Sequence, residues 1–391
     1  MSVDHAVANA SVESEWDFLL AASSADPEKT GLVRVRTLLG EQLNWEAVLR
    51  LANDHGTTSL LYKTCLEFRD VVPPPVMAVL RERYEKNVQK SLFLARELIR
   101  ILDCMDALGV EAIPYKGVVL AEAYHGDMAM RQSGDMDIFV RKSEVERIRN
   151  AVRDLGYEPH AVIAEAAWPN YIASGYECTF DSSAGKNLLE LQWALQPRFY
   201  AVDFDMDVLF ERAVGVSVAG RRMKTPSPED LLLVLSIHAA KHVWERLIWL
   251  CDIARIARRE NLNWEWVQAQ ARGLGIERIL HITLLLTNRC LGMPIPGPIE
   301  RALLADRDAG ILTEQIAATF ARGGSYQELQ PSYFRLMMRL RERRIDRLRF
   351  LARLIFTPGP GEWDAVRLPK TLFPLYPLVR LARLAGRLAR R

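Results

Sequence analysis

Apolar and polar positions follow a helical spacing over the first hundred residues. From Glu15 to about Leu108, apolar residues recur every three or four positions, which predicts a succession of amphipathic helices. The run Val-Val-Pro-Pro-Pro at 71–75 interrupts this pattern. A long helix is predicted after it, from about Val76 to Leu108, with Gly109 in the position that commonly ends a helix.

The pattern changes between residues 110 and 195, where short apolar runs alternate with helical ones. Strands are predicted at Val110–Tyr115, Met136–Val140, Gly156–His160, Tyr176–Phe180 and Leu188–Trp193, the last two forming a hairpin. Helices are predicted at Val118–Tyr124 and Glu144–Leu155, the second capped by Ser143 with Glu146 three residues on. This alternation predicts a small mixed sheet with helices packed on it.

Helical periodicity returns after about residue 200. The tetrapeptide Ser227-Pro228-Glu229-Asp230 combines a capping serine, a proline at the first helical position and two acids in the first turn. Four helices are predicted from there on, at Leu231–His242, Leu247–Arg258, Trp264–Arg272 and Ile276–Leu291. An arginine-rich helix is predicted over 335–353.

Together these patterns predict an α+β protein: a small mixed β-sheet core flanked by N-terminal and C-terminal helical regions. The chain of 391 residues is 49% apolar and 26% charged, which excludes low-complexity disorder and suggests two or three domains. We expect four segments: an N-terminal helical region (1–108), a mixed core (109–225), a C-terminal helical domain (226–330) and an arginine-rich tail (331–391).

Cysteine usage and hydropathy bear on the location of the protein. The five cysteines are widely spaced and contain no CxxC pair, which argues against a disulfide framework and a thiolate zinc site. No run of apolar residues is long enough for a transmembrane segment, and the N-terminus lacks the features of a signal peptide. We therefore expect a cytoplasmic protein.

The net charge of +2 conceals an asymmetry. The 51 basic and 49 acidic residues nearly cancel, yet 333–356 contains eight arginines and two acids, and the last twelve residues contain five arginines and no acid. Three interpretations of this region compete. It packs by its apolar face and shows arginine to solvent, or lies on an anionic membrane as a peripheral anchor, or binds RNA or another polyanion through phosphates.

The candidate chemistry centres on the segment from Ser133 to Val140. Asp135 and Asp137 are two residues apart at the start of an apolar strand, so their side chains point to the same side. Two carboxylates held this close repel each other, and a hard divalent cation such as Mg²⁺ relieves the repulsion. The alternative is a solvated turn with two surface acids, since such a pair is common.

Three further features favour a phosphate and metal site. Lys116-Gly117 ends one predicted strand and opens a helix, where backbone N–H groups and the lysine ammonium stabilise phosphate oxygens. Arg131 precedes the acids and is placed to neutralise a triphosphate. Glu190 stands in the centre of an apolar strand, where an unpaired carboxylate is costly, and it supplies a third carboxylate for a two-metal site.

These motifs resemble a known family. Tyr115-Lys116-Gly117, Gly134-Asp135-Met136-Asp137-Ile138 and Leu189-Glu190-Leu191-Gln192-Trp193 resemble the uncharacterised nucleotidyltransferases, within the nucleotidyltransferase superfamily of DNA polymerase β. The resemblance covers about residues 15–290. Members of this family occur in polysaccharide and lasso-peptide biosynthesis clusters.

The resemblance implies a function and assigns residues to it. Residues 109–225 would be the nucleotidyltransferase core, and the chain would use Mg²⁺ or Mn²⁺ to move a nucleoside monophosphate from a nucleoside triphosphate to an unidentified acceptor hydroxyl or phosphate. Asp135, Asp137 and Glu190 would be the catalytic metal ligands. Lys116, Gly117, Arg131, Ser133 and Gly134 would bind the nucleotide. The alternative is a catalytically weak accessory module that binds nucleotide, RNA or anionic membrane, because Lys116 and Gly117 stand where the superfamily has its glycine turn and the second small residue of that turn is absent.

A histidine pair completes the candidates. His238 and His242 are four residues apart on one helix face, which suits zinc, but no glutamate follows His238 to make the usual motif. A structural or substrate-pocket role is favoured, and the resemblance places the pair near the active cleft with Lys241. Asp252 on the next helix is predicted either to be their partner or to be a surface acid. Trp249 is predicted to be a core or interface anchor.

Overall fold

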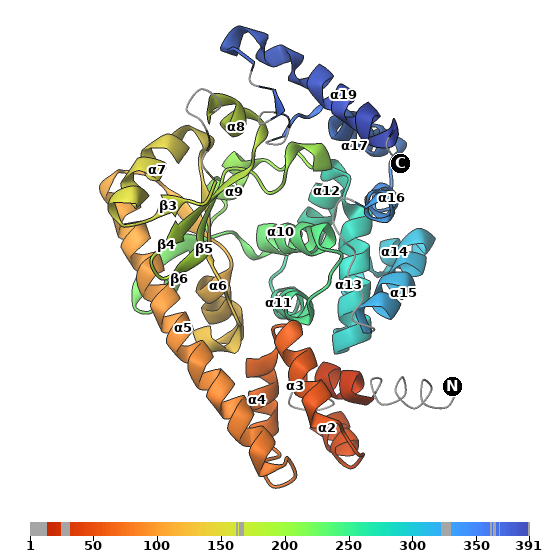
Figure 1. Ribbon diagram of the computed structural model, residues 1–391. Coiled ribbons are helices and arrows are strands. Elements are labelled where there is room, and N and C mark those ends of the chain that lie inside the picture. The colour runs from red at the N-terminus through yellow and green to blue at the C-terminus, as the bar shows by residue number, and fades with distance from the viewer. Residues whose placement is uncertain are drawn as a thin grey trace.

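The computed structural model describes residues 14–24, 32–161, 163, 168–321, 330–359, 362, 365, 366 and 368–389. It confirms an α+β architecture in which a small mixed sheet lies between helices from both ends of the chain (Figure 1). Two apolar cores hold it together. One lies between the sheet and its outer helices, and the larger one joins the N-terminal helices to the C-terminal ones.

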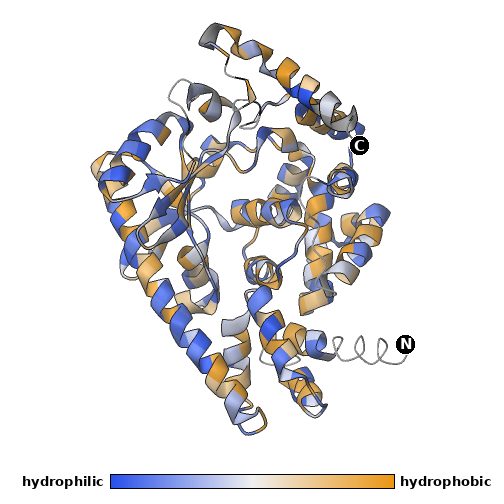
Figure 2. Cartoon of the chain, viewed as in Figure 1, coloured by the Kyte–Doolittle hydropathy of each residue, from blue (hydrophilic) through white to orange (hydrophobic). Residues whose placement is uncertain are grey.

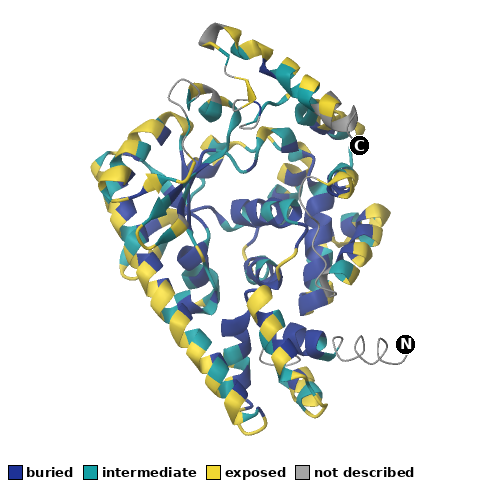
Figure 3. Ribbon diagram, viewed as in Figure 1, coloured by how far each residue is buried: buried dark blue, intermediate teal, exposed yellow. Residues whose placement is uncertain are grey.

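The N-terminal region is helical, as the spacing predicts. Residues 14–23 are helical and are followed by helices α2 (Leu32–Leu39), α3 (Trp45–Asp54), α4 (Thr58–Leu66) and α5 (Pro74–Ala107). Helix α5 ends where Gly109 adopts a φ of 67°, which confirms the predicted stop. Figure 3 shows an exposed stripe along α5, whose other side packs on the sheet and on neighbouring helices.

The five-stranded sheet has the order β1-β2-β5-β4-β3. Its strands are β1 (Ala112–Pro114), β2 (Met136–Val140), β3 (Glu158–Pro159), β4 (Glu177–Ser182) and β5 (Gly185–Gln192). The central pair, β2 and β5, is parallel, and the remaining pairs are antiparallel. The predicted strands and the β4–β5 hairpin are confirmed within a few residues.

Strand alternation gives the sheet two different faces. On β2, Met136, Ile138 and Val140 pack into the core beneath α5 and α7 (Val145–Asp154). Phe139 belongs to the other core and shares its face with Asp137. The polar face of the sheet is thereby turned away from α5 and α7.

Two local predictions in this region need correction. Ser143 does not cap α7, because a short 3₁₀ turn, Lys142–Glu144, leads into the helix and puts Glu144 at its N-cap. The sequence pattern also missed a second hairpin, β6 (Val214–Val218) with β7 (Arg221–Thr225). Strand β6 (VGVSV) alternates valine with small residues and strand β7 (RRMKT) has a single apolar residue. Each has only five residues, so their periodic signal is weak.

Short helical elements connect the strands. They are α6 (Gly117–Leu120) with the π-turn Ala121–His125, the 3₁₀ turns Met128–Met130 and Arg198–Tyr200, α8 (Trp168–Ser174) and α9 (Met206–Glu211). Gly117 has a φ of 59°, and a Cβ there would lie 3.3 Å from the Asp135 carbonyl oxygen. Glycine therefore lets α6 approach the turn that carries the two aspartates.

The C-terminal helices form the larger core. They are α10 (Pro228–Lys241), α11 (Leu247–Ala257), α12 (Trp264–Leu274), α13 (Glu277–Leu291), α14 (Gly297–Ala305) and α15 (Arg307–Ala321). Ser227 caps α10 by accepting from the Asp230 N–H, as predicted. Figure 2 shows apolar residues concentrated on α10, α11 and α13, the central helices of this half.

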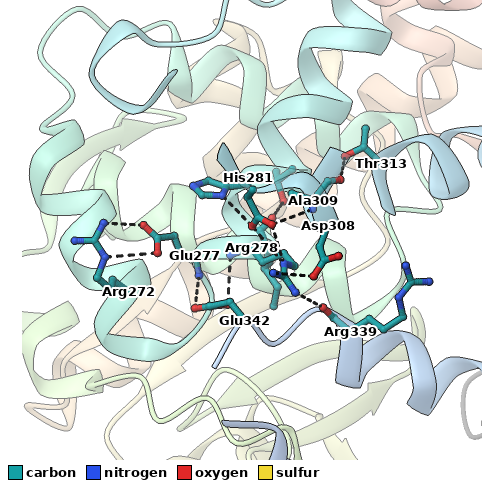
Figure 4. A network of polar contacts seen from close by, with 12 residues as sticks. Arg272, Glu277, Arg278, His281, Asp308, Ala309, Thr313, Arg339 and Glu342 are labelled. Atoms are coloured by element: carbon teal, nitrogen blue, oxygen red, sulfur yellow. Dashed lines mark hydrogen bonds and ion pairs between the residues drawn. The ribbon is translucent and has the colours of Figure 1, made fainter. Parts of the chain in front are cut away.

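The arginine-rich helix predicted over 335–353 is instead two helices, α16 (Pro331–Arg339) and α17 (Arg344–Phe356). The break has a tertiary cause (Figure 4). The Glu342 carboxylate accepts from the backbone N–H groups of Glu277 and Arg278 and so caps α13, whose own N-cap residue makes no side-chain cap. Arg278 in turn donates to the Arg339 carbonyl at the end of α16.

The tail packs on the helical half and keeps an exposed apolar stripe. Leu336, Met337 and Phe350 are buried in the larger core, and Arg353 forms an ion pair with Asp203. Ile345, Leu348 and Leu351 of α17 are nevertheless exposed, and so is Leu378 of α19 (Tyr376–Ala389), which follows the 3₁₀ turn Lys370–Leu375. No helix in the described parts of the chain is both long and apolar enough to cross a bilayer.

The interface between α3 and α11 makes stability depend on pH. Burial lowers the pKa of His55 from 6.5 to about 4, and its Nδ1 accepts from the Leu247 N–H. Because the folded-state pKa is the lower one, the unfolded chain binds more protons below pH 6.5, so stability falls as pH drops. We expect this residue to remove about 3 kcal/mol from the free energy of unfolding between pH 7 and 4.

Urea unfolding at several pH values checks this expectation. The His55→Gln variant should be less stable at pH 7 but lose less stability toward pH 4 than wild type. An unchanged pH dependence in the variant would contradict it.

Candidate functional site

A cavity of about 550 Å³ lies between the polar face of the sheet and helices α10 and α11. Ten of the eleven predicted site residues line it, and Gly117 is the exception. The sheet contributes the acids, and the helices contribute the histidines and Lys241. The arrangement therefore brings the two predicted groups to opposite walls of one cavity.

The register of the central strands places two carboxylates side by side. Asp137 of β2 lies directly opposite Glu190 of the parallel strand β5, and the two face the cavity together. Asp135 lies in the turn just before β2 and completes the group. Asp137 is 4% exposed, so its charge needs a partner within the protein or from a ligand.

Lys116 supplies that partner. Its Nζ donates to Asp137 Oδ1 at 2.9 Å and lies 4.9 Å from the centre of the Tyr115 ring. Although burial opposes its charge, the acids Asp137 and Glu190 raise the pKa of Lys116 above its ordinary value. Lys116 is therefore charged at neutral pH inside the acidic cluster.

The pKa values of the two remaining carboxyl groups are raised, because acidic groups are crowded together here. Burial, followed by the charge of Asp137, raises the pKa of Asp135 from 3.8 to about 6. The same two causes, with Glu177, raise the pKa of Glu190 from 4.5 to about 8. The crowding of these carboxyl groups thus favours their protonated forms where no further cation is bound.

The carboxylate groups of the cluster are chemically suited to a hard cation. Their side chains, however, are not arranged to bind one. Carboxylate oxygens are the ligands that Mg²⁺ and Mn²⁺ prefer. Among the described residues, however, no three carboxylate, imidazole or thiol groups are already placed to hold a metal ion. Asp137 is engaged by Lys116, and Glu190 Oε2 accepts from Gln192 Nε2 at 2.9 Å. A cation would have to replace these donors.

The sequence pattern missed a polar layer next to the acids. Gln192 accepts from the Tyr115 hydroxyl at 2.8 Å and lies opposite Glu177 of β4. Burial raises the pKa of Glu177, and its carboxylate accepts from the Tyr176 hydroxyl. Applying the strand period to β4 from the Asp137–Glu190 face would have found Glu177, since alternate residues share a face.

Arg131 is held by a buried network behind the aspartate turn. Its Nε donates to Asp252 Oδ2 at 2.9 Å, and its Nη1 donates to Ser133 Oγ at 3.0 Å. His125 Nε2 lies 2.8 Å from Asp252 Oδ1, while its Nδ1 accepts from Arg255. Asp252 is fully buried, so it is not a surface acid. Its two oxygens pair with Arg131 and His125, so it is not the partner of His238 and His242 either, and both predictions are wrong.

The opposite wall is built from the end of α10. His238, His242 and Trp249 are in mutual ring contact, with centroids 4.9–5.6 Å apart. Burial lowers the pKa of both histidines, that of His242 to about 3, so both are neutral at pH 7. Trp249 is half-buried and lines the cavity. Lys241 Nζ donates to the Tyr176 hydroxyl at 3.2 Å and so links the two walls.

A strained turn fixes this wall. Val243 and Trp244 follow His242 and both have a φ of 51°, a conformation that is costly for residues with a Cβ, above all for the β-branched valine. The Trp244 ring is buried in the larger core, and its Nε1 donates to Thr283 Oγ1 at 2.9 Å. The buried Trp244 ring therefore holds the strained turn in place next to the cavity wall.

Comparisons with known proteins identify what this chain is similar to. The family model described as uncharacterised nucleotidyltransferase matches residues 41–292. No curated protein matches. Among solved structures, an antigenic nucleotidyltransferase-like protein from Paracoccidioides brasiliensis is similar, with 14% identity and a TM-score of 0.29, over 54% of this chain and 94% of that one.

Proposed function

The chain belongs to the family of uncharacterised nucleotidyltransferases, and we propose that it is a metal-dependent, polymerase-β-like enzyme that transfers a nucleoside monophosphate. The observation that carries the proposal is the pairing of Asp137 with Glu190 beside Asp135 on one wall of the cavity. Asp135, Asp137 and Glu190 would hold Mg²⁺ or Mn²⁺, which supplies charge stabilisation at the phosphates and at the acceptor oxygen.

The chain's own residues have separate tasks in this reaction. Lys116 and Arg131 neutralise the triphosphate, and Ser133 and Gly134 position it beside the acids. The acceptor oxygen forms a bond to the α-phosphorus as the bond from the α-phosphorus to the bridging oxygen breaks, and pyrophosphate leaves. The acceptor's proton goes to the Glu190 carboxylate, which lines the cavity directly opposite Asp137. Before a cation binds, Gln192 orients the Glu190 carboxylate.

A transfer assay with α-labelled nucleoside triphosphates tests the function. We expect label to move to an acceptor pool of sugar phosphates, peptides or RNA ends in the presence of Mg²⁺ or Mn²⁺, and this transfer to stop on chelation with EDTA. Nucleotide binding is measured in parallel. Absence of both binding and transfer with either metal would overturn the proposal, whereas binding without transfer would favour the accessory-module alternative.

A second candidate activity is peripheral attachment to an anionic membrane. The supporting observation is the stripe of exposed Ile345, Leu348 and Leu351 on α17, one helical face bordered by arginines. Such attachment would place the enzyme beside a lipid-linked acceptor, on the cytoplasmic side that the free cysteines suit.

Vesicle flotation tests this attachment. We expect the protein to bind phosphatidylglycerol vesicles more tightly than phosphatidylcholine vesicles and to dissociate at high salt. Leu348→Glu should weaken binding about tenfold, because a leucine is no longer buried in lipid. Leu304→Glu, at another exposed leucine, is the matched control. Equal binding by both variants would exclude this surface, and salt-sensitive binding of RNA alone would favour the polyanion interpretation.

A further inference from the structure

The Lys116 ammonium occupies an unusual position within the acidic cluster. It is the N-cap residue of α6, and its side chain is 10% exposed and Asp137's is 3% exposed. Its 2.9 Å contact uses Oδ1 of Asp137, which lies directly opposite Glu190 and two residues after Asp135. The contact thus involves the very group on which a divalent cation would depend.

Simultaneous occupancy by the two cations is unfavourable. An ammonium and a divalent cation on one buried carboxylate would repel each other strongly, because little water is present to screen them. The ammonium is on a flexible four-carbon stem, whereas the strand backbone fixes Asp137. The lysine is therefore the part that can move.

We propose that Lys116 is a tethered cation that holds the acidic cluster before the metal enters and then transfers its charge to the nucleotide phosphates. This inference rests on the proposed function. Metal entry breaks the Lys116–Asp137 ion pair and frees a buried ammonium, which needs a new anionic partner. A triphosphate in the same cavity provides that partner.

This exchange couples the two ligands. Metal alone binds weakly, because it must displace Lys116 without compensation. Metal together with nucleotide binds well, because the displaced ammonium pairs with phosphate. Lys116 thereby favours joint binding of metal and nucleotide over binding of metal alone, beyond the affinity that the two have for each other.

Mn²⁺ binding, followed by electron paramagnetic resonance without and with a non-hydrolysable nucleoside triphosphate, tests the exchange. Lys116→Met removes the ammonium and should tighten binding of Mn²⁺ alone about tenfold while reducing the enhancement by nucleotide. Lys116→Arg restores a cation and should return Mn²⁺ affinity toward wild type. Lys90→Met removes the same charge from an exposed residue of the same cavity and should have a smaller effect on Mn²⁺ alone.

The outcomes of this experiment distinguish failure of the Lys116 exchange from failure of the proposed function. Lys116→Met leaves Asp137 buried without its partner, so the rise in melting temperature on adding Mn²⁺ should also be larger than in wild type. This rise can be measured even if the variant folds poorly without metal. Unchanged or weaker Mn²⁺ binding by Lys116→Met, with normal binding by wild type, overturns the tethered cation and leaves the proposed function intact. Absence of Mn²⁺ binding by wild type, even with nucleotide, overturns both.

Discussion

Replacing Asp137 by alanine is expected to lower the rate of nucleotidyl transfer about 10³-fold or more. Asp137 lies opposite Glu190 across the central strand pair and holds the Lys116 ammonium, so its removal takes away the shared centre of the cluster. The loss should appear mainly in kcat, because the charge that Asp137 helps to stabilise develops in the transition state. Single-turnover transfer of α-labelled nucleotide measures it.

Controls separate lost chemistry from lost folding. Asp137→Asn keeps the shape of the side chain and should lose nearly as much activity with less loss of stability. Asp181→Asn makes the same change on β4, at a residue that faces His160 outside the cavity, and should retain near wild-type transfer. If Asp137→Asn were folded and as active as Asp181→Asn, the proposed role of Asp137 would be wrong.

Replacing Asp252 by alanine is expected to lower the free energy of unfolding by about 3–5 kcal/mol. Its carboxylate is fully buried and pairs with Arg131 on one oxygen and His125 on the other. Removing it leaves the Arg131 guanidinium charged and buried without its ion-pair partner, and the cost of that desolvated charge dominates the loss. Urea unfolding monitored by circular dichroism measures it.

A double variant isolates the cause of this loss. If the uncompensated charge dominates, Asp252→Ala combined with Arg131→Met should be more stable than Asp252→Ala alone, since the buried charge is gone. A cavity or helix-packing effect would instead make the two changes additive. The double variant should still transfer nucleotide poorly, because Arg131 also donates to Ser133 in the turn that precedes Asp135.

The sequence by itself determined the elements and the residue types of the site. Helical spacing located the helices, and the strand period placed Asp137 and Glu190 on apolar strands, with Asp135 just before the first of them on the side that Asp137 faces. These signals are local, since each depends on residues within a few positions of one another. The same local rule, applied to β4, was sufficient in principle to find Glu177.

Only the tertiary structure decided how the charges pair. Lys116 reaches Asp137 across 21 residues, Arg131 reaches Asp252 across 121, and Glu342 caps a helix that begins 65 residues earlier. Such contacts depend on how distant elements pack, and no periodicity within either segment specifies the partner. For this reason the sequence predicted one continuous arginine-rich helix and did not predict the ion pair between Lys116 and Asp137. The folded chain has an ammonium within the acidic cluster and a helix broken so that one of its glutamates caps another helix.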